Sequence, residues 1–307
     1  MLNTAPTLTL TQHHPRRFRD RHYVYPVVSR RSGGLSLGIN LSPTAQCNFT
    51  CVYCQVLGER DVRFPNCEGL QENNRIEDGM SPLIDLPRLE SELRELIGMV
   101  ENGELFQEDR FAQTPPDKRG LQDIAFSGDG EPTLNSRFPE VVQRVAIVRA
   151  ECCPPSTKIV LITNGTRLNV PKVREACRML LANNGEIWAK LDAGTEEYFR
   201  TISRSTLSFE KILSNLAQAA KKIPLVIQSC FLLLHGEEPA MVEIQAYADR
   251  LRKIIDGGGT IQRVQIYTTA RRTPEPWVLP LPDDRINEIA TFVRRQTGLT
   301  VETFYSR

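Results

Sequence analysis

The sequence predicts an α/β protein whose strands form a parallel sheet, and two regularities lead to this fold class. Short apolar runs alternate with helix-like runs from residue 35 onward. Inside the short runs the apolar residues follow one another instead of alternating with polar ones, as in parallel strands that are buried on both faces. Repeated strand–helix units favour right-handed crossovers and a sheet that is either open or curled into a barrel.

Six segments are predicted strands, and several of them end in glycine or threonine. In α/β folds ligands bind beyond the C-terminal ends of the strands, so these polar tails are where chemistry is expected. In chain order the predicted strands are LSLGINL (35–41), LQDIAFSG (121–128), KIVLITNG (158–165), EIWAKLDAG (186–194), PLVIQSCFLLL (224–234) and RVQIYTT (263–269).

Amphipathic helical patterns separate these strands. In 171–182 the apolar residues Val173, Ala176, Cys177 and Leu180 recur at the spacing of one helix face. An Asn-Asn-Gly sequence then ends the helix. The other predicted helices span residues 85–99, 136–150, 209–221, 239–255 and 283–296.

Two segments depart from the strand–helix rhythm. Residues 59–119 hold 15 acidic and 8 basic residues, and both an inserted lid and a plain surface excursion fit them. Residues 1–31 hold six Arg and one Asp and are predicted to be a basic N-terminal extension of a core domain at 32–307. Either this extension packs on the barrel or it contacts phosphate or RNA.

The composition excludes several classes of protein. The 307 residues suffice for one large α/β domain or two ordinary ones. With 38 Lys and Arg against 37 Asp and Glu, no overall charge draws the chain to nucleic acid or to a membrane. No apolar run reaches the roughly 18 residues of a membrane span.

Cysteine usage predicts a reducing cytosol. The N-terminus lacks the cationic start and apolar core of a signal peptide, and its Arg-rich continuation matches a transit peptide poorly. Eight cysteines in a chain of this length, including the adjacent Cys152 and Cys153, do not make a secreted disulfide framework. In the cytosol, clustered cysteines typically bind metal or act in catalysis.

The stretch CNFTCVYC places Cys47, Cys51 and Cys54 directly after the first predicted strand. A structural zinc site needs four ligands, and the next cysteine, Cys67, has no partner pair. Iron–sulfur clusters are also held by thiolates, four in the ordinary electron carriers. Three thiolates would leave one iron open to a small ligand, whereas a purely structural triplet is the simpler alternative.

With Tyr53 before its last cysteine, the C-x-x-x-C-x-x-C triplet resembles the signature of the radical S-adenosylmethionine (SAM) enzymes. That resemblance implies a partial (βα)6 barrel of parallel strands with outer helices. It also implies that the three cysteines bind a 4Fe–4S cluster whose fourth iron chelates S-adenosyl-L-methionine, with Tyr53 beside the cofactor. Reductive cleavage of the cofactor would give a 5′-deoxyadenosyl radical that abstracts hydrogen from a substrate. An external electron donor of the flavodoxin or ferredoxin type would be required.

Two further strand ends agree with that family. SGDGEPTL (127–134) resembles its Gly-Gly-Glu-Pro motif, although Asp129 replaces the first glycine. Glycine lets the backbone approach a ligand, and a glutamate can accept a hydrogen bond from the cofactor's ammonium group. TNG (163–165) resembles a second motif of the family. Alternatively, SGDGEPTL is a plain turn before a helix. The cofactor candidates at these two strand ends are Ser127, Gly128, Gly130, Glu131 and Asn164.

The later strand ends supply weaker candidates. Lys190 and Asp192 are two residues apart and therefore point to the same side of a strand. If that side is inward, Asp192 would hold the ribose hydroxyls and Lys190 would be a catalytic candidate, unless the two only form a space-filling ion pair. Gln228, for the cofactor, and Tyr267, for catalysis, are further candidates. Arg271 and Arg272 suit a phosphate or carboxylate of the substrate, or they are solvated loop residues.

A closer resemblance covers about residues 25–282. VVSRRSGGLSLGIN (27–40), KLDAG (190–194) and QIYTTARRTPEP (265–276) are together similar to stand-alone radical SAM proteins related to the wybutosine-synthesising tRNA enzymes. The chain has no second-cluster cysteines in 1–46 and no length for a flavodoxin-like domain. Both differences count against an RNA substrate, whereas the basic N-terminus favours one. A tRNA base is thus one substrate to consider, with a peptide or a metabolite as alternatives. A non-catalytic iron–sulfur electron carrier is the remaining alternative, and formation of 5′-deoxyadenosine would exclude it.

Overall fold

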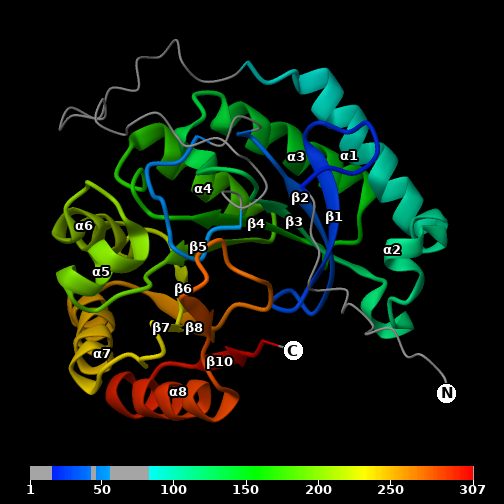
Figure 1. Ribbon diagram of the computed structural model, residues 1–307. Helices are drawn as coiled ribbons and strands as arrows, with labels where there is room; N and C mark the ends of the chain where they lie inside the picture. The colour runs from blue at the N-terminus through cyan, green and yellow to red at the C-terminus, as the bar shows by residue number, and fades with distance from the viewer. Residues whose placement is uncertain (1–15, 43–45, 56–82, 307) are drawn as a thin grey trace, which may run out of the picture.

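An eight-stranded sheet, curled into a half-barrel, carries the fold (Figure 1). The structure is a computed structural model that describes residues 16–42, 46–55 and 83–306. The strands lie in the order β1-β2-β3-β4-β5-β6-β8-β10, and all neighbours from β2 onward pair in parallel. The parallel α/β fold class is thus confirmed. The six predicted strands are β2 (Gly34–Ile39), β3 (Leu121–Phe126), β4 (Lys158–Thr163), β5 (Gly185–Lys190), β6 (Leu225–Cys230) and β8 (Ile261–Tyr267).

Two strands at the sheet edges were not predicted. β1 (Val24–Ser29) pairs antiparallel with β2, so the sheet begins inside the segment assigned to the basic extension. Its Pro26 suits an edge strand, because proline has no N–H to donate to a neighbour on the open side. β10 (Val301–Phe304) adds a parallel strand beside β8. A separate pair is formed by β7 (Leu232–Leu234) and β9 (Val278–Pro280).

Helices follow the outer side of the curled sheet (Figure 1). All six predicted helices are present, and α4 has the predicted bounds. α5 was not predicted. In chain order the helices of the described residues that have eight residues or more are α1 (Leu86–Glu101), α3 (Phe138–Cys152), α4 (Pro171–Ala182), α5 (Glu196–Ser203), α6 (Phe209–Ala220), α7 (Met241–Asp256) and α8 (Asp283–Thr297). A short α2 (Asp109–Ala112) follows α1. None of the helices among the described residues is long and apolar enough to cross a membrane.

The described part of the acidic insertion, residues 59–119, packs on the sheet edge. α1 lies against α3 and β1. Its buried Glu92 accepts hydrogen bonds from the backbone N–H groups of His22 (2.9 Å), Tyr23 (2.8 Å) and Val24 (3.2 Å). α1 therefore holds the entry to β1 in place. Residues 56–82 lie outside the described residues, so a lid in that part of the insertion stays a prediction.

Glu186 on β5 ties three strands together and gives a first prediction. Its carboxylate accepts from Lys158 Nζ and Arg263 Nη2, each at 2.6 Å, and from Trp188 Nε1 at 2.7 Å. Burial favours the neutral acid, but the hydrogen bonds from Arg263 and Lys158 prevail and lower the pKa of Glu186 to about 2. A depressed folded-state pKa stabilises the fold above the unfolded pKa, and the stabilisation is lost as pH falls toward the folded value.

Glu186→Gln is expected to lower the free energy of unfolding by up to about 3 kcal/mol at neutral pH. The difference from wild type should shrink below about pH 4.5, where the carboxylate of the unfolded chain becomes protonated. Urea unfolding at several pH values measures it, with the exposed Glu197→Gln as a neutral control. A difference that does not change with pH would contradict this role.

Candidate functional site

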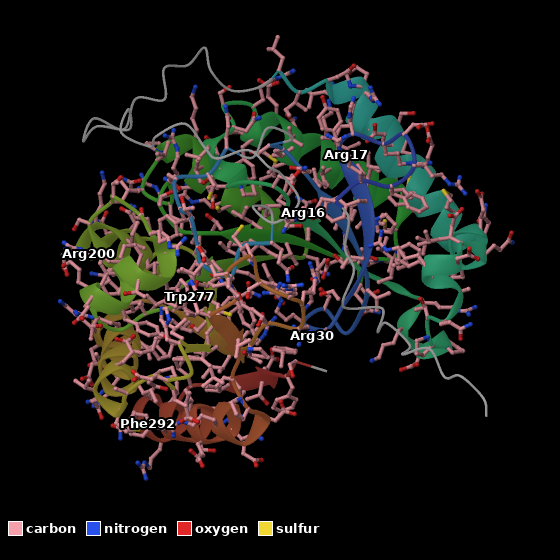
Figure 2. The ribbon with its side chains drawn as sticks, viewed as in Figure 1. Arg16, Arg17, Arg30, Arg200, Trp277 and Phe292 are labelled. Atoms are coloured by element: carbon pink, nitrogen blue, oxygen red, sulfur yellow. The ribbon has the colours of Figure 1, made fainter. Side chains whose placement is uncertain are left out.

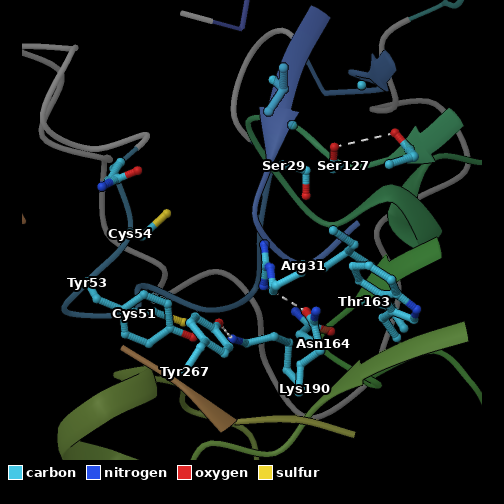
Figure 3. Close-up of a pocket in the computed structure, with 18 of the residues that line it drawn as sticks. Ser29, Arg31, Cys51, Tyr53, Cys54, Ser127, Thr163, Asn164, Lys190 and Tyr267 are labelled. Carbon is cyan, nitrogen blue, oxygen red and sulfur yellow. Dashed lines mark hydrogen bonds between the residues drawn. The ribbon is translucent and has the colours of Figure 1, made fainter. Parts of the chain in front are cut away.

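The C-terminal ends of the strands surround one pocket of about 330 Å³ (Figure 3). It receives side chains from the loop after β2, from the ends of β3, β4 and β5, and from β6 and β8. All but one of the residues selected from the sequence line it. These are Cys47, Cys51, Tyr53, Cys54, Ser127, Gly128, Gly130, Glu131, Asn164, Lys190, Asp192, Gln228, Tyr267 and Arg271. Arg272 is exposed and does not line the pocket.

The cysteine loop is held by backbone hydrogen bonds to the end of α5. Thr50 N–H donates to the carbonyl of Ser203 and Val52 N–H to that of Ile202, both at 2.9 Å. A turn in which Cys54 N–H donates to the Cys51 carbonyl (2.9 Å) follows. The unpredicted helix α5 therefore fixes where the thiols lie.

The chemistry of the thiols fits an iron–sulfur cluster. Cys47, Cys51 and Cys54 all line the pocket as free thiols. Burial, followed by the nearby Glu131 carboxylate, raises the pKa of Cys47 to about 12, so a thiolate there requires a cationic partner. No three His, Cys, Asp or Glu side chains of the described residues converge on a single metal ion. A cubane cluster does not require this, since each thiolate binds its own iron. Cys67 lies outside the described residues.

Asp192 connects the cysteine loop to the ends of β5 and β6. One carboxylate oxygen accepts from Tyr53 Oη at 2.5 Å. The other accepts from the backbone N–H of Cys230 at 2.8 Å and lies 3.2 Å from Lys190 Nζ. The aromatic residue before the last cysteine is therefore anchored to the fourth predicted strand. The ribose contact proposed for Asp192 stays a prediction.

Lys190 is a fixed positive charge inside the pocket. Its ammonium donates to Tyr267 Oη and lies 5.0 Å and 4.7 Å from the ring centroids of Tyr53 and Tyr267. Burial opposes this charge, but Asp192 and Tyr267 outweigh it and raise the pKa of Lys190 above its ordinary value. The side chain is thus suited to electrostatic stabilisation and not to service as a general base.

Glu131 is buried and its carboxylate is already hydrogen-bonded within the chain. One oxygen accepts from Thr133 N–H (3.1 Å), Thr133 Oγ1 (2.6 Å) and Thr163 Oγ1 (2.7 Å). The other accepts from Asn164 N–H at 2.7 Å. In these contacts Glu131 joins the loops after β3 and β4. Asn164 in turn donates to Asn48 Oδ1 at 2.7 Å, beside Cys47.

The loop after β3 approaches the cysteine loop through its glycines. A Cβ on Gly130 would lie 2.1 Å from the carbonyl oxygen of Gln46, the residue before the first cysteine. Gly128 has a φ of +146°, which side chains rarely adopt. Asp129, which replaces a motif glycine, uses its side chain to bind Arg16 (3.1 Å) and Asn40 (2.8 Å). Ser127 pairs with Tyr25 Oη at 3.0 Å.

Comparison with solved structures identifies the architecture. The chain aligns with Streptococcus suis SuiB bound to S-adenosylmethionine, with a TM-score of 0.51 and 10% identity, over 90% of this chain and 49% of SuiB. The protein shares the fold of SuiB. The partial barrel of parallel strands that the resemblance implied is thus confirmed at the level of the fold. A structure of TYW1 aligns over 86% of this chain and 74% of TYW1, with a TM-score of 0.47 and 15% identity.

Sequence comparison adds distant relatives. The chain is 23% identical over 304 residues to a protein of Brachyspira hyodysenteriae named GTPase Obg. This alignment covers 97% of this chain and 37% of the Brachyspira protein. The chain is 25% identical over 231 residues to a UPF0026 protein of Helicobacter pylori, covering 75% and 61%. The chain thus spans less than two thirds of either relative. The present sequence contains no Gly-Lys pair, and therefore no phosphate-binding loop of the pattern G-x-x-x-x-G-K-[S/T]. No family model matches the chain.

The sequence left one wall of the pocket unidentified. Arg30 and Arg31 come from the turn between β1 and β2, and Arg16 precedes β1. Figure 2 shows Arg16 and Arg30 toward the middle of the molecule and Arg200 at its rim. The sequence signal for this wall was an Arg-Arg pair followed by Ser-Gly-Gly, which is typical of a turn. That signal shows that the arginines line the pocket only when the position of β1 is known. Gln228 lies deeper, donating to Gln265 and accepting from Arg31 Nη1 at 3.1 Å.

Proposed function

We propose that this protein is a radical SAM enzyme that binds a 4Fe–4S cluster through Cys47, Cys51 and Cys54 and S-adenosyl-L-methionine beside it. The observation that supports this most is the convergence of the three thiols, the Gly130–Glu131 loop and Asn164 in one pocket of a radical SAM fold. When bound, the cluster and cofactor would supply a 5′-deoxyadenosyl radical that abstracts hydrogen from substrate. A flavodoxin or ferredoxin would supply the electron.

The chain's own residues would orient the cofactor and exclude water. Glu131 holds the loops after β3 and β4 together, and Asp192 holds Tyr53 against the end of β5. Lys190 would present a fixed positive charge to the reacting groups. Trp188 and Gln228 on the inner side of the sheet are almost fully buried and line the floor of the pocket, which favours a water-poor cavity.

A tRNA base is a second candidate substrate, and the described part of the N-terminal segment bears on it. Three of the arginines near the N-terminus form ion pairs in the structure: Arg16 with Asp129, Arg19 with Glu104 and Glu108, and Arg21 with Glu95. Arg17 is exposed. These pairs favour a packing role for the described part of the extension, although its first 15 residues lie outside the described ranges.

The proposed function predicts that anaerobically reconstituted, dithionite-reduced protein converts S-adenosyl-L-methionine to 5′-deoxyadenosine and methionine. Chromatography of quenched reactions measures both products in equal amounts. Unreduced protein is the matched control, because cleavage requires the electron. Protein that holds the full cluster, binds the cofactor and yet forms no 5′-deoxyadenosine would favour the electron-carrier alternative.

A further inference from the structure

One wall of the pocket is made by two segments that are distant in the sequence. Arg30 and Arg31 come from the β1–β2 turn, and Thr269 and Arg271 from the loop after β8. Arg30 Nη2 donates to the carbonyl of Thr268 at 3.4 Å, which holds the turn against the loop. Arg31 Cζ lies over the Tyr267 ring, 4.8 Å from its centroid, and Figure 3 labels both residues among those that line the pocket. This arrangement brings cationic side chains to the side of the pocket formed by the β1–β2 turn.

Two buried polar atoms of this wall have no hydrogen-bond partner. They are Arg30 Nη1 and Thr269 Oγ1. The other buried side-chain atoms of the described residues that lack a hydrogen-bond partner belong to residues that do not line the pocket. Buried polar groups almost always have partners in folded proteins. Two such atoms, on pocket-lining residues from chain-distant segments, indicate a place for a ligand that accepts hydrogen bonds.

The charges of Arg30 and Arg31 are not neutralised by the two carboxylates of the pocket, while Arg271 donates to Gln55 Oε1 at 2.5 Å. Glu131 and Asp192 line the pocket, but both already bind protein donors, as described above. Within the part of the chain that the structure describes, no ion pair involves Arg30 or Arg31. Burial, and then Arg31, lower the pKa of Arg30, and burial, Arg16 and Arg31 lower that of Arg271 to about 10. The guanidinium groups therefore repel one another in a poorly solvated place, which an anion would relieve.

We propose that Arg30, Arg31, Thr269 and Arg271 bind an oxyanion, a phosphate or carboxylate group, of the substrate. Guanidinium forks and a hydroxyl donor suit the several acceptor oxygens of such a group. An anion there would position the rest of the substrate toward the cysteine loop. The oxyanion site itself is argued only from the residues of this wall. The inference rests on the proposed function in one respect, which is that the ligand is called a substrate.

The test titrates the anaerobic holoprotein calorimetrically with inorganic phosphate, pyrophosphate and malonate, with and without S-adenosyl-L-methionine. Saturable binding of at least one anion is expected, and a preference for a phosphate or for malonate identifies the group. Arg30→Gln should weaken that binding by about tenfold or more, since it removes a charged donor. Thr269→Val keeps the shape and the charge and should weaken it by about threefold to tenfold. If Arg30→Gln does not fold, as judged by its melting curve, Thr269→Val decides the test.

Arg272→Gln is the matched control, because Arg272 is exposed on the same loop and outside the pocket. An equal loss of affinity in Arg272→Gln would show a diffuse field and overturn the proposal. Saturable binding of none of the three anions would also overturn it. So would displacement of the anion by S-adenosyl-L-methionine, because the wall would then serve the cofactor. Formation of 5′-deoxyadenosine by wild type is measured on the same samples, so that the proposed function and the oxyanion site fail separately.

Discussion

Cys51→Ala is expected to reduce the iron and sulfide of reconstituted protein from about four per chain to background and to abolish 5′-deoxyadenosine formation. Cys47→Ala and Cys54→Ala should behave in the same way. The reason is that each of the three thiolates would bind one iron, and the fourth iron would stay open for the cofactor. Removing one leaves two protein ligands, and the cluster should not assemble or persist. Iron and sulfide assays with the visible absorption spectrum measure the result.

Cys152→Ala and Cys153→Ala are the matched controls, because both thiols lie at the end of α3 and outside the pocket. They should keep wild-type iron content and activity. Full iron content in Cys51→Ala would remove the basis of the proposed function. About eight irons per wild-type chain would instead mean that the protein holds a second cluster, which contradicts the single-cluster assignment.

The parallel core could be predicted because its strands carry uninterrupted apolar runs that end in recognisable polar sequences. β1 and α5 could not. β1 contains Pro26 and lies at the sheet edge, so neither its composition nor its pattern resembles that of the buried strands. α5 spans only Glu196–Ser203, about two turns, which is too short for a convincing helical period. Both elements matter to the site, since β1 leads into the turn that carries Arg30 and Arg31, and α5 holds the cysteine loop.

In the candidate site, the sequence predicted which types of residue lie at the strand ends but not which contacts they make. Sequence order placed cysteines, glycines and carboxylates at the strand ends, where the structure has them. It could not show that Glu131 is hydrogen-bonded to Thr163 and Asn164, because those contacts join different strands 32 and 33 residues apart. It also treated Arg271 and Arg272 alike, whereas one lines the pocket and the other is exposed. Which way a loop side chain faces depends on packing that no local pattern records.

Gly130→Ala is expected to damage the cluster site without touching any thiol. The new methyl carbon would lie 2.1 Å from the Gln46 carbonyl oxygen and 2.7 Å from Ser42 Cβ. Gln46 directly precedes Cys47, and its carbonyl also accepts the backbone N–H of Glu131 at 3.0 Å. The clash is with backbone, which cannot rotate away, so the cysteine loop and the β3 loop must separate. Such overpacking typically costs about 1–3 kcal/mol of stability.

The measurement combines urea unfolding of the apoprotein with the iron content after reconstitution. Gly130→Ala should be less stable than wild type and should bind markedly less iron, because Cys47 moves with Gln46. Gly120→Ala is the control directly before β3, where the nearest atom to the added Cβ is Gln122 Nε2 at 3.5 Å. It should bind iron normally and be as stable as wild type or more so by up to about 1 kcal/mol, because alanine restricts the unfolded chain. Normal stability and iron content in Gly130→Ala would show that the two loops do not depend on this close approach.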